Sequence, residues 1–328
     1  MKELLTYLFE GNTLTREEAK EVLIAVGQGK HSEIEFASLL TVFLMRPITS
    51  DELGGFREAM LGLCLHTDLS AYNAIDVVGT GGDGKNTFNI STLASFIIAG
   101  AGYKVTKHGN YAVSSNSGSS NVLEYLGYNF SNEKAELEKQ LDTAGICFLH
   151  APLFHPAMKY IAPVRKALKV KTFFNILGPM TNPTSPKCQV LGVYDKSAFD
   201  LYKEVYKTSD IGHIIINSVD GYDEVSLTAN IRFASGDSEG ELKPEDFGFT
   251  TVSPEELYGG ASIKEAAKIF TDILSGNGTE AQNNVVAANA ALGIRCFEPE
   301  KDLTECVAIA TKSLKSGKAL QSLKNFIL

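Results

Sequence analysis

The segment DVVGTGGDGKNTFNIST (76–92) constrains the fold of this chain more than any other. Its apolar start has the composition of a buried strand, and the apolar residues after Thr92 have the spacing of a helix. Four glycines lie between the two and leave backbone N–H groups uncovered. Asn89, Ser91 and Thr92 are typical of a helix start, where unpaired N–H groups and a partial positive charge attract anions. A strand, a glycine turn and a helix start form a phosphate-binding arrangement.

A tight strand-to-helix connection accounts for the same glycines without any ligand. The loop also differs from two common nucleotide-binding motifs, because it contains neither GxxxxGK[ST] nor GxGxxG followed by a distant acid. The sequence therefore argues against an ATPase or a dinucleotide-dependent dehydrogenase, and other segments must decide between a phosphate site and a plain turn.

The order of predicted elements indicates an α/β fold. Five short apolar runs are typical of buried parallel strands: AIDVVG, YKVTKHG, ICFLHA, CQVLGVY and HIIINS. Helical patterns at 133–143 and 197–207 separate several of them, and 263–274, 281–292 and 303–316 return to helix. The Gly- and acid-rich segment 235–246 is expected to form a surface excursion. We therefore predict a larger α/β domain with a mostly parallel central sheet flanked by helices.

The first 70 residues predict a small helical domain. A hydroxyl three residues before a carboxylate is the capping-box signature of a helix start. Three such sites precede apolar helical periodicities: TREE (15–18), SEIE (32–35) and TSDE (49–52). A small amphipathic bundle of this kind commonly packs against a partner.

Composition limits the possible functions. The formal charge is −9 and the basic residues are dispersed, so bulk attraction to nucleic acid or to an anionic membrane is not expected. No apolar run is long enough to span a bilayer, and MKELLTYLFE lacks the pattern of a signal peptide, so we expect a cytoplasmic protein. The five cysteines are far apart and predict neither a zinc site nor a disulfide framework.

A second anion-receptive segment is KHGNYAVSSNSGSSNVLEYLG (107–127). A strand ends at Lys107, a run of serines follows, and a helix is expected near Asn121. Two such helix starts suggest two phosphate groups, although a flexible polar loop with ordinary capping is the alternative. Lys107 adds a positive charge and His108 a titratable donor.

A third segment, NSVDGYDEVSL (217–227), places Asp223 and Glu224 just past a predicted strand, where open α/β sheets bind ligands. Adjacent acids in a loop are most often solvated surface. Carboxylates are also suitable ligands for Mg²⁺, and two nearby phosphate sites favour that interpretation.

These three segments, together with HAPLFHPAMKYIAPVRKALKVKTFFNILGPMTNP, resemble the anthranilate phosphoribosyltransferase family of tryptophan biosynthesis in order and spacing over nearly the whole chain. The resemblance implies Mg²⁺-dependent transfer of a 5-phosphoribosyl group from 5-phosphoribosyl 1-diphosphate to the amine of anthranilate, releasing pyrophosphate. It also implies a homodimer formed through the helical domain. The implied domains are 1–70 with a returning segment near 160–187, which is helical, and 71–159 with 188–328, which binds the donor.

The resemblance also implies the site residues, with positioning and electrostatics in place of a catalytic acid or base. Mg²⁺ would be held by Ser91, Asp223 and Glu224. Anthranilate would contact Gly79, Asn110, His155, Met158 and Arg165. The donor would contact Gly79, Gly82, Asp83, Thr87, Asn89, Ile90, Ser91, Thr92, Lys107, His108, Gly109, Asn110, Tyr111, Ala112, Val113, Ser114, Ser115 and Ser119.

Two positions depart from the family pattern, because Tyr111 stands where an arginine is usual and Asn121 where an aspartate is frequent. Two alternative functions share the fold. A pyrimidine nucleoside phosphorylase would use inorganic phosphate, and the HPAMK and PVR motifs disfavour it. A non-catalytic nucleic-acid-binding relative should have a basic groove, whereas this chain is acidic and keeps Asn110 and Arg165.

Overall fold

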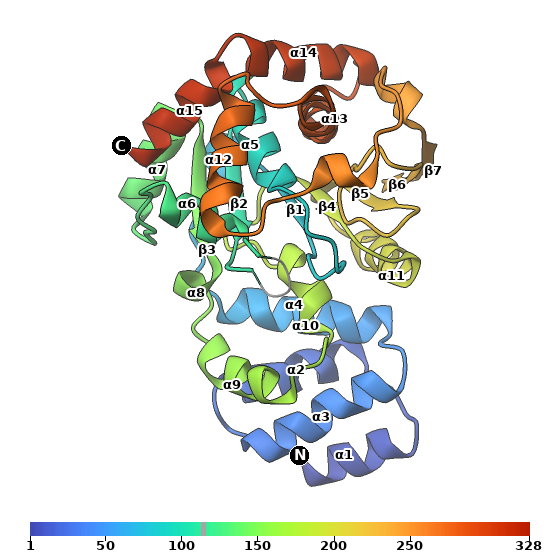
Figure 1. The fold of residues 1–328 in the computed structure, drawn as a ribbon. Helices are drawn as coiled ribbons and strands as arrows, with labels where there is room; N and C mark the ends of the chain where they lie inside the picture. Colours follow the sequence, from blue (N-terminus) through green and yellow to red (C-terminus); the bar gives the residue numbers. More distant parts are fainter. Residues whose placement is uncertain (113–115) are drawn as a thin grey trace.

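The computed structural model describes residues 1–112 and 116–328. Figure 1 shows two parts, a helical layer containing the N-terminus and a larger α/β part containing the C-terminus. The helical layer consists of α1 (Lys2–Phe9), α2 (Arg16–Gly27), α3 (Glu33–Met45), α4 (Ser50–Leu63), α9 (Met158–Leu168) and α10 (Phe174–Leu177). Helix α9 packs against α2 and α3, so a segment from the middle of the chain joins the N-terminal helices.

The α/β part is built on one seven-stranded sheet with the order β3-β2-β1-β4-β5-β6-β7. Its strands are β1 (Ile75–Gly79), β2 (Val105–Gly109), β3 (Ile146–His150), β4 (Cys188–Gly192), β5 (Gly212–Ser218), β6 (Ile231–Ser235) and β7 (Ser238–Leu242). The first five strands pair in parallel, as predicted, and the last two are antiparallel. The strand order runs outward from β1 in both directions, which creates a ligand-binding switch point at its carboxyl end.

The segment 235–246 was expected to form a surface excursion, and most of it is exposed, but it also contains regular structure that the sequence did not predict. It contains β7, which pairs with β6 from Ile231 to Ser235. Most of β7 is exposed, so its residues lack the apolar alternation by which a strand is recognised in a sequence.

The two faces of the sheet are covered differently. One face packs against α5 (Ile90–Gly100), α12 (Ile263–Leu274), α13 (Glu280–Phe297), α14 (Leu303–Lys315) and α15 (Lys318–Ile327). The other face packs against α7 (Lys134–Ala144) near β3, and against α11 (Lys196–Tyr206) and the helical layer near β4 and β5. The remaining short helices are α6 (Ser119–Tyr125) and α8 (Ala151–Phe154), with 3-10 turns at Ser70–Tyr72, Gly178–Met180, Pro244–Phe247 and Pro254–Leu257.

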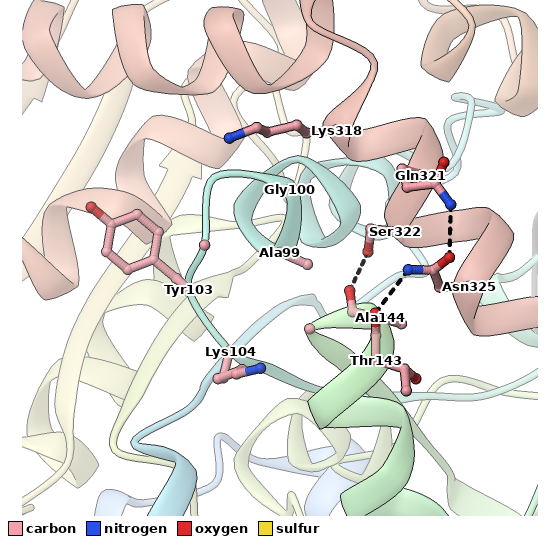
Figure 2. Close-up of a pocket in the computed structure, with 12 residues that line it drawn as sticks. Ala99, Gly100, Tyr103, Lys104, Thr143, Ala144, Lys318, Gln321, Ser322 and Asn325 are labelled. Atoms are coloured by element: carbon pink, nitrogen blue, oxygen red, sulfur yellow. Dashed lines mark hydrogen bonds between the residues drawn. The ribbon is translucent and has the colours of Figure 1, made fainter.

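The C-terminal helix is tied to the body of the α/β part by side-chain hydrogen bonds (Figure 2). Ser322 Oγ donates to Ala144 O at 2.6 Å, and Asn325 Nδ2 donates to Thr143 O at 2.8 Å. Both acceptors are last-turn carbonyls of α7 that have no partner within their own helix. No helix in the described part of the chain is long and apolar enough to cross a membrane.

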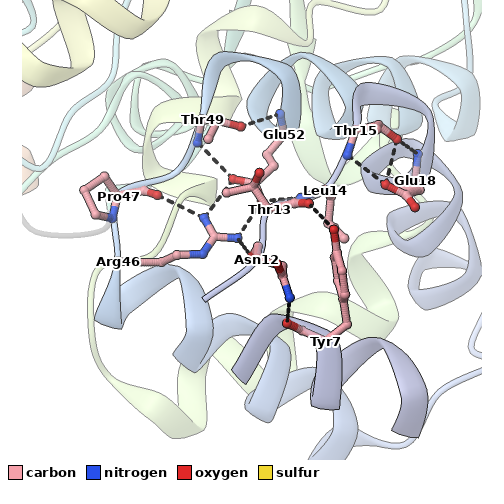
Figure 3. Close-up of polar contacts among 10 residues, drawn as sticks. All are labelled: Tyr7, Asn12, Thr13, Leu14, Thr15, Glu18, Arg46, Pro47, Thr49 and Glu52. Carbon is pink, nitrogen blue, oxygen red and sulfur yellow. Dashed lines mark hydrogen bonds and ion pairs between the residues drawn. The ribbon is translucent and has the colours of Figure 1, made fainter. Parts of the chain in front are cut away.

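All three predicted capping boxes are present, at the starts of α2, α3 and α4. The one at α4 does more than cap (Figure 3), because the fully buried Glu52 also joins two other segments. Its carboxylate accepts from the backbone N–H of Thr49 and Leu14, both at 2.9 Å, and from Arg46 at 2.6 and 2.9 Å. Burial alone raises the pKa of Glu52, but these donors outweigh it and hold the pKa below its usual value.

We predict that Glu52→Gln lowers the free energy of unfolding by about 3 kcal/mol, because it leaves the Arg46 guanidinium without its counter-charge. Glu35→Gln is the matched control, since Glu35 occupies the same capping-box position in α3 but bonds only its own cap, Ser32, apart from a longer 4.0 Å contact with His31. The control should lose much less stability. Urea unfolding of both variants measures the difference, and equal losses would contradict the assignment of Glu52 as a link between helices.

Candidate active site

A cavity of about 720 Å³ lies where the carboxyl ends of β1, β2, β3 and β5 face the helical layer. Nineteen of the residues expected from the sequence line it, as follows: Gly79, Gly82, Asp83, Thr87, Asn89, Ser91, Thr92, Lys107, His108, Gly109, Asn110, Tyr111, Ala112, Ser119, His155, Met158, Arg165, Asp223 and Glu224. Ile90 does not line it, because its side chain is buried in the core beneath α5. Val113, Ser114 and Ser115 lie outside the described residues.

The glycines of the β1 loop serve two different purposes. Gly81, Gly82 and Gly84 have φ values of +63°, +74° and +77°, which side chains rarely adopt. Gly79 is needed for space, because a Cβ there would lie 2.3 Å from Asp223 Oδ2. The loop is therefore shaped to receive the acid-containing segment after β5 as well as to expose its own amides.

Asp223 and Glu224 hold the two halves of the predicted phosphate site together. Asp223 Oδ2 accepts from the Gly81 N–H at 2.6 Å, and Glu224 Oε1 accepts from the Ser91 N–H at 3.0 Å. Ser91 belongs to the first turn of α5, so a carboxylate occupies part of the helix start that the sequence assigned to phosphate.

Both acids are partly buried, and the loss of solvent around them raises the pKa of Asp223 to about 7 and that of Glu224 to about 8. Each is raised further by a neighbouring acid, Asp83 for Asp223 and Asp223 for Glu224. The Oε2 atom of Glu224 is buried without a hydrogen-bond partner in the described structure. Ionising these two carboxylates costs free energy in the folded protein, and Glu224 Oε2 has no hydrogen-bond partner in the described structure. Both features fit a divalent cation that takes its other ligands from a bound phosphate.

Lys107 supplies a buried positive charge beside the acids. Its ammonium donates to Val77 O at 2.7 Å and lies 3.5 Å from Ser91 Oγ. Burial lowers the pKa of Lys107, while Asp76 and Glu224 oppose that shift. The carboxylates and this ammonium together form a polar floor for the cavity at the ends of β1, β2 and β5.

The opposite end of the cavity is formed by α9, α10 and the segment after them. Arg165 lies over the Phe174 ring with its Cζ 5.1 Å from the ring centre, and no carboxylate in the described part of the chain pairs with it. His155 Nε2 lies 3.3 Å from His108 Nε2. Burial lowers the pKa of His155 to about 4 and that of His108 well below its ordinary value, so both rings are neutral near pH 7. This end offers a free guanidinium and two uncharged imidazoles.

The two departures from the family pattern have local explanations. The Tyr111 hydroxyl donates to Glu124 at 3.1 Å, and its ring packs edge-on against His150 with centroids 4.9 Å apart. Asn121 Oδ1 accepts from the N–H groups of Gly118 and Ala112, at 3.0 and 2.9 Å. Asn121 lies in the first turn of α6, which begins at Ser119, so it organises the second loop as an aspartate would.

Several cavity residues were not anticipated from the sequence. Some belong to the quoted motifs and could have been included: Thr80, Gly81, Lys85, Phe88, Ser117, Gly118, Pro152, Pro156, Lys159 and Asn175. The others, which except for Met60 also lie in the quoted motifs, have mostly apolar or small side chains that suggest no chemistry: Met60, Val78, Ala151, Ala162, Phe174, Leu177, Gly178, Pro179 and Thr181. Lys171, from the segment between α9 and α10, donates to Gly82 O and so contacts the glycine loop from the helical layer.

A second hollow, of about 250 Å³, lies between α5, α7 and α15 (Figure 2). Its Ser322, Asn325 and Gln321 side chains already hydrogen-bond to protein atoms. Among the described residues no acid lines it, and it is remote from the carboxyl ends of the strands. The larger cavity is therefore the candidate active site.

Comparison with known proteins gives one consistent result. A family model described as "Glycosyl transferase family, a/b domain" matches residues 71–320, and "Glycosyl transferase family, helical bundle domain" matches residues 2–64. A relative from Flavobacterium psychrophilum named anthranilate phosphoribosyltransferase is 55% identical over 324 residues, covering 99% of this chain and 98% of its own.

Solved structures agree with the sequence comparison. The anthranilate phosphoribosyltransferase of Thermus thermophilus superposes with a TM-score of 0.92 at 33% identity, covering 98% of both chains. The enzyme of that name from Saccharomyces cerevisiae, in complex with PRPP and Mg, gives a TM-score of 0.90 at 28% identity, covering 98% of this chain and 95% of the other. The yeast enzyme with 4-fluoroanthranilate gives 0.86 at 26% identity, covering 98% and 95%.

The raised pKa values of the acid pair predict an unusual pH dependence of stability. From about pH 4 to pH 8 the unfolded chain ionises these acids before the folded protein does, so the free energy of unfolding falls as the pH rises. Without divalent ions, the double variant Asp223→Asn and Glu224→Gln should gain thermal stability relative to wild type between about pH 5 and pH 8. Melting curves across this range test the prediction, and a pH-independent difference between the two proteins would contradict it.

Proposed function

This chain belongs to the glycosyl transferase family, among the anthranilate phosphoribosyltransferases, and on that premise we propose how its cavity transfers a 5-phosphoribosyl group to anthranilate. The donor is 5-phosphoribosyl 1-diphosphate, and pyrophosphate leaves. The observation that carries this proposal is the hydrogen bond from the Gly81 amide to Asp223, which joins the bare glycine loop to the acid pair in one cavity.

The donor end is suited to a sugar diphosphate. Breaking the bond between the sugar and the diphosphate builds negative charge on the leaving group, and groups placed to meet that charge favour the transition state over the bound donor. We assign this role to the Lys107 ammonium and to the backbone amides of the glycine loop. Asp223, Glu224 and the Ser91 hydroxyl would hold Mg²⁺, whose charge offsets that of the pyrophosphate.

The acceptor end needs no strong base. An aromatic amine is neutral near pH 7, so its nitrogen can attack without first losing a proton. The neutral rings of His155 and His108 suit a positioning role better than proton transfer. The planar guanidinium of Arg165 matches a carboxylate in a two-pronged pair, and since no carboxylate among the described residues pairs with it, it is available to the carboxylate of anthranilate.

A single assay tests the proposed function against its alternatives. Purified protein is mixed with Mg²⁺, 5-phosphoribosyl 1-diphosphate and anthranilate, and the loss of anthranilate fluorescence is followed. Fluorescence should fall only when all three are present. Phosphorolysis of uridine or thymidine without any loss of anthranilate would favour a nucleoside phosphorylase, and tight DNA binding without either activity would favour a binding protein.

Changing Arg165 should affect the acceptor and not the donor. Arg165→Met removes the charged hydrogen-bond donor, so we expect the KM for anthranilate to rise by about tenfold or more. Arg165→Lys keeps the charge but loses the planar fork, and should give an intermediate value. Steady-state kinetics with each substrate varied in turn provides the measurement, and an unchanged KM for anthranilate in Arg165→Met would remove Arg165 from the acceptor site.

We propose that the helical layer also forms a homodimer in the cytoplasm. Large apolar side chains are exposed on α1 and α3, where Phe9 is 67%, Ile34 80% and Met45 82% exposed. Helices α1 and α3 contact each other, and large apolar side chains exposed on both favour a protein contact on this part of the helical layer. The corresponding division of the chain is a helical domain of 1–70 with 160–187, and a donor-binding domain of 71–159 with 188–328.

The dimer proposal predicts a change in mass on substitution. Phe9→Glu combined with Met45→Glu should convert the protein from dimer to monomer in sedimentation analysis, because two buried charges at an apolar interface are costly. Glu3→Lys, on the same helix as Phe9, controls for a general effect of surface charge. A wild-type protein that sediments as a monomer would contradict the proposal.

A further inference from the structure

The acceptor end of the cavity is bounded by a segment that no sequence motif assigned to binding. Gly178, Pro179 and Thr181 line the cavity there. His108 and His155 line the same part of the cavity, and the backbones of Gly178 and Thr181 partly oppose the lowering by burial of the pKa of His108 and His155, respectively. We call residues 178–181 the acceptor wall.

The acceptor wall is followed directly by Asn182, whose side-chain amide nitrogen and oxygen both hydrogen-bond to protein groups. Asn182 is 2% exposed, and its Nδ2 donates to Asp76 Oδ2 at 2.9 Å and to Thr106 O at 2.8 Å. Its Oδ1 accepts from the N–H and the hydroxyl of Thr184, at 2.9 and 2.8 Å. Asp76 belongs to β1 and Thr106 to β2, so one side chain fastens the end of the wall to both strands that lead into the donor site.

Burying Asp76, the hydrogen-bond partner of Asn182, costs free energy of folding. Asp76 is fully buried, and burial raises the pKa of its carboxyl to about 6, against the opposing effects of Lys107, Asn182 and the His108 N–H. A buried ionic group of this kind is weak evidence for stability, because well-packed apolar residues often serve as well. The contact between Asn182 and Asp76 is better explained by the orientation that it gives to the acceptor wall and to the ends of β1 and β2.

We propose that Asn182 is a positioning residue for the acceptor. Through Asp76 and Thr106 it holds the acceptor wall against His108 and His155, and so sets where the amine of the acceptor lies relative to the bound donor. This inference rests on the proposed function, since it assigns the acceptor to that end of the cavity. Reacting atoms must approach to about 3–3.5 Å, and a displacement of about 1 Å costs roughly a hundredfold in rate.

The first test is Asn182→Ala, with Thr184→Val as a milder variant that loosens the same contacts. We expect Asn182→Ala to raise the KM for anthranilate by about tenfold and to lower kcat, while the KM for the donor changes by less than about twofold. Thr184→Val should move the same parameters less. Tyr128→Phe is the matched control, because it removes one buried hydrogen bond, to Gln140, far from the cavity.

Exchanging the amide and the carboxylate between positions 182 and 76 tests the hydrogen bond between Asn182 and Asp76 directly. Asn182→Asp places a second carboxylate against Asp76 and should raise the KM for anthranilate more than Asn182→Ala does. Adding Asp76→Asn restores a donor and an acceptor between the two positions, and should recover part of that loss. If Asn182→Asp does not fold, Asn182→Ala and Thr184→Val still decide the question.

The outcomes separate this inference from the function on which it rests. A wild-type protein that consumes no anthranilate overturns the proposed function and this inference with it. If the wild type is active, three results for Asn182→Ala would overturn this inference alone. They are unchanged KM values for both substrates, an equal change in both KM values, or a loss of activity only in proportion to the fall in melting temperature, as judged against Tyr128→Phe.

Discussion

The close approach of Asp223 to the glycine loop is the contact on which the candidate active site depends. The carboxylate accepts from the Gly81 amide, and it can do so only because position 79 has no Cβ. Through Glu224 the same segment reaches the start of α5 at Ser91. One short acidic segment therefore brings the loop after β1, the first turn of α5 and the end of β5 to a single point.

The charged side chains of the protein do not balance one another where these three segments meet. Two partly buried acids with raised pKa values share the cavity with one buried ammonium, Lys107, whose own pKa is lowered by burial. A protein with a net charge of −9 must bind an anionic donor through local groups and not through its overall field. In the proposed function a divalent cation would bridge these carboxylates and the diphosphate, which would account for carboxylates at a place where an anion is expected.

Much of this was predictable from the sequence, and the exceptions share a physical cause. The parallel strands, the capping boxes and the three polar loops follow from local patterns of residues. The β6–β7 hairpin was missed because β7 is mostly exposed and lacks apolar alternation. The acceptor wall and the contact between Asn182 and Asp76 were missed because they join residues 106 positions apart that have no local pattern. Ile90 was included by the family resemblance, although its side chain belongs to the core.

The most direct test of the account is the dependence of donor binding on Mg²⁺, measured by calorimetry with wild type and with the double variant Asp223→Asn and Glu224→Gln. We expect Mg²⁺ to strengthen binding of 5-phosphoribosyl 1-diphosphate to wild type, and the double variant to lose most of this enhancement while keeping its fold. Equal enhancement by Mg²⁺ in both proteins would contradict the assignment of the acid pair, and with it the central claim that the glycine loop and the acids form one donor site.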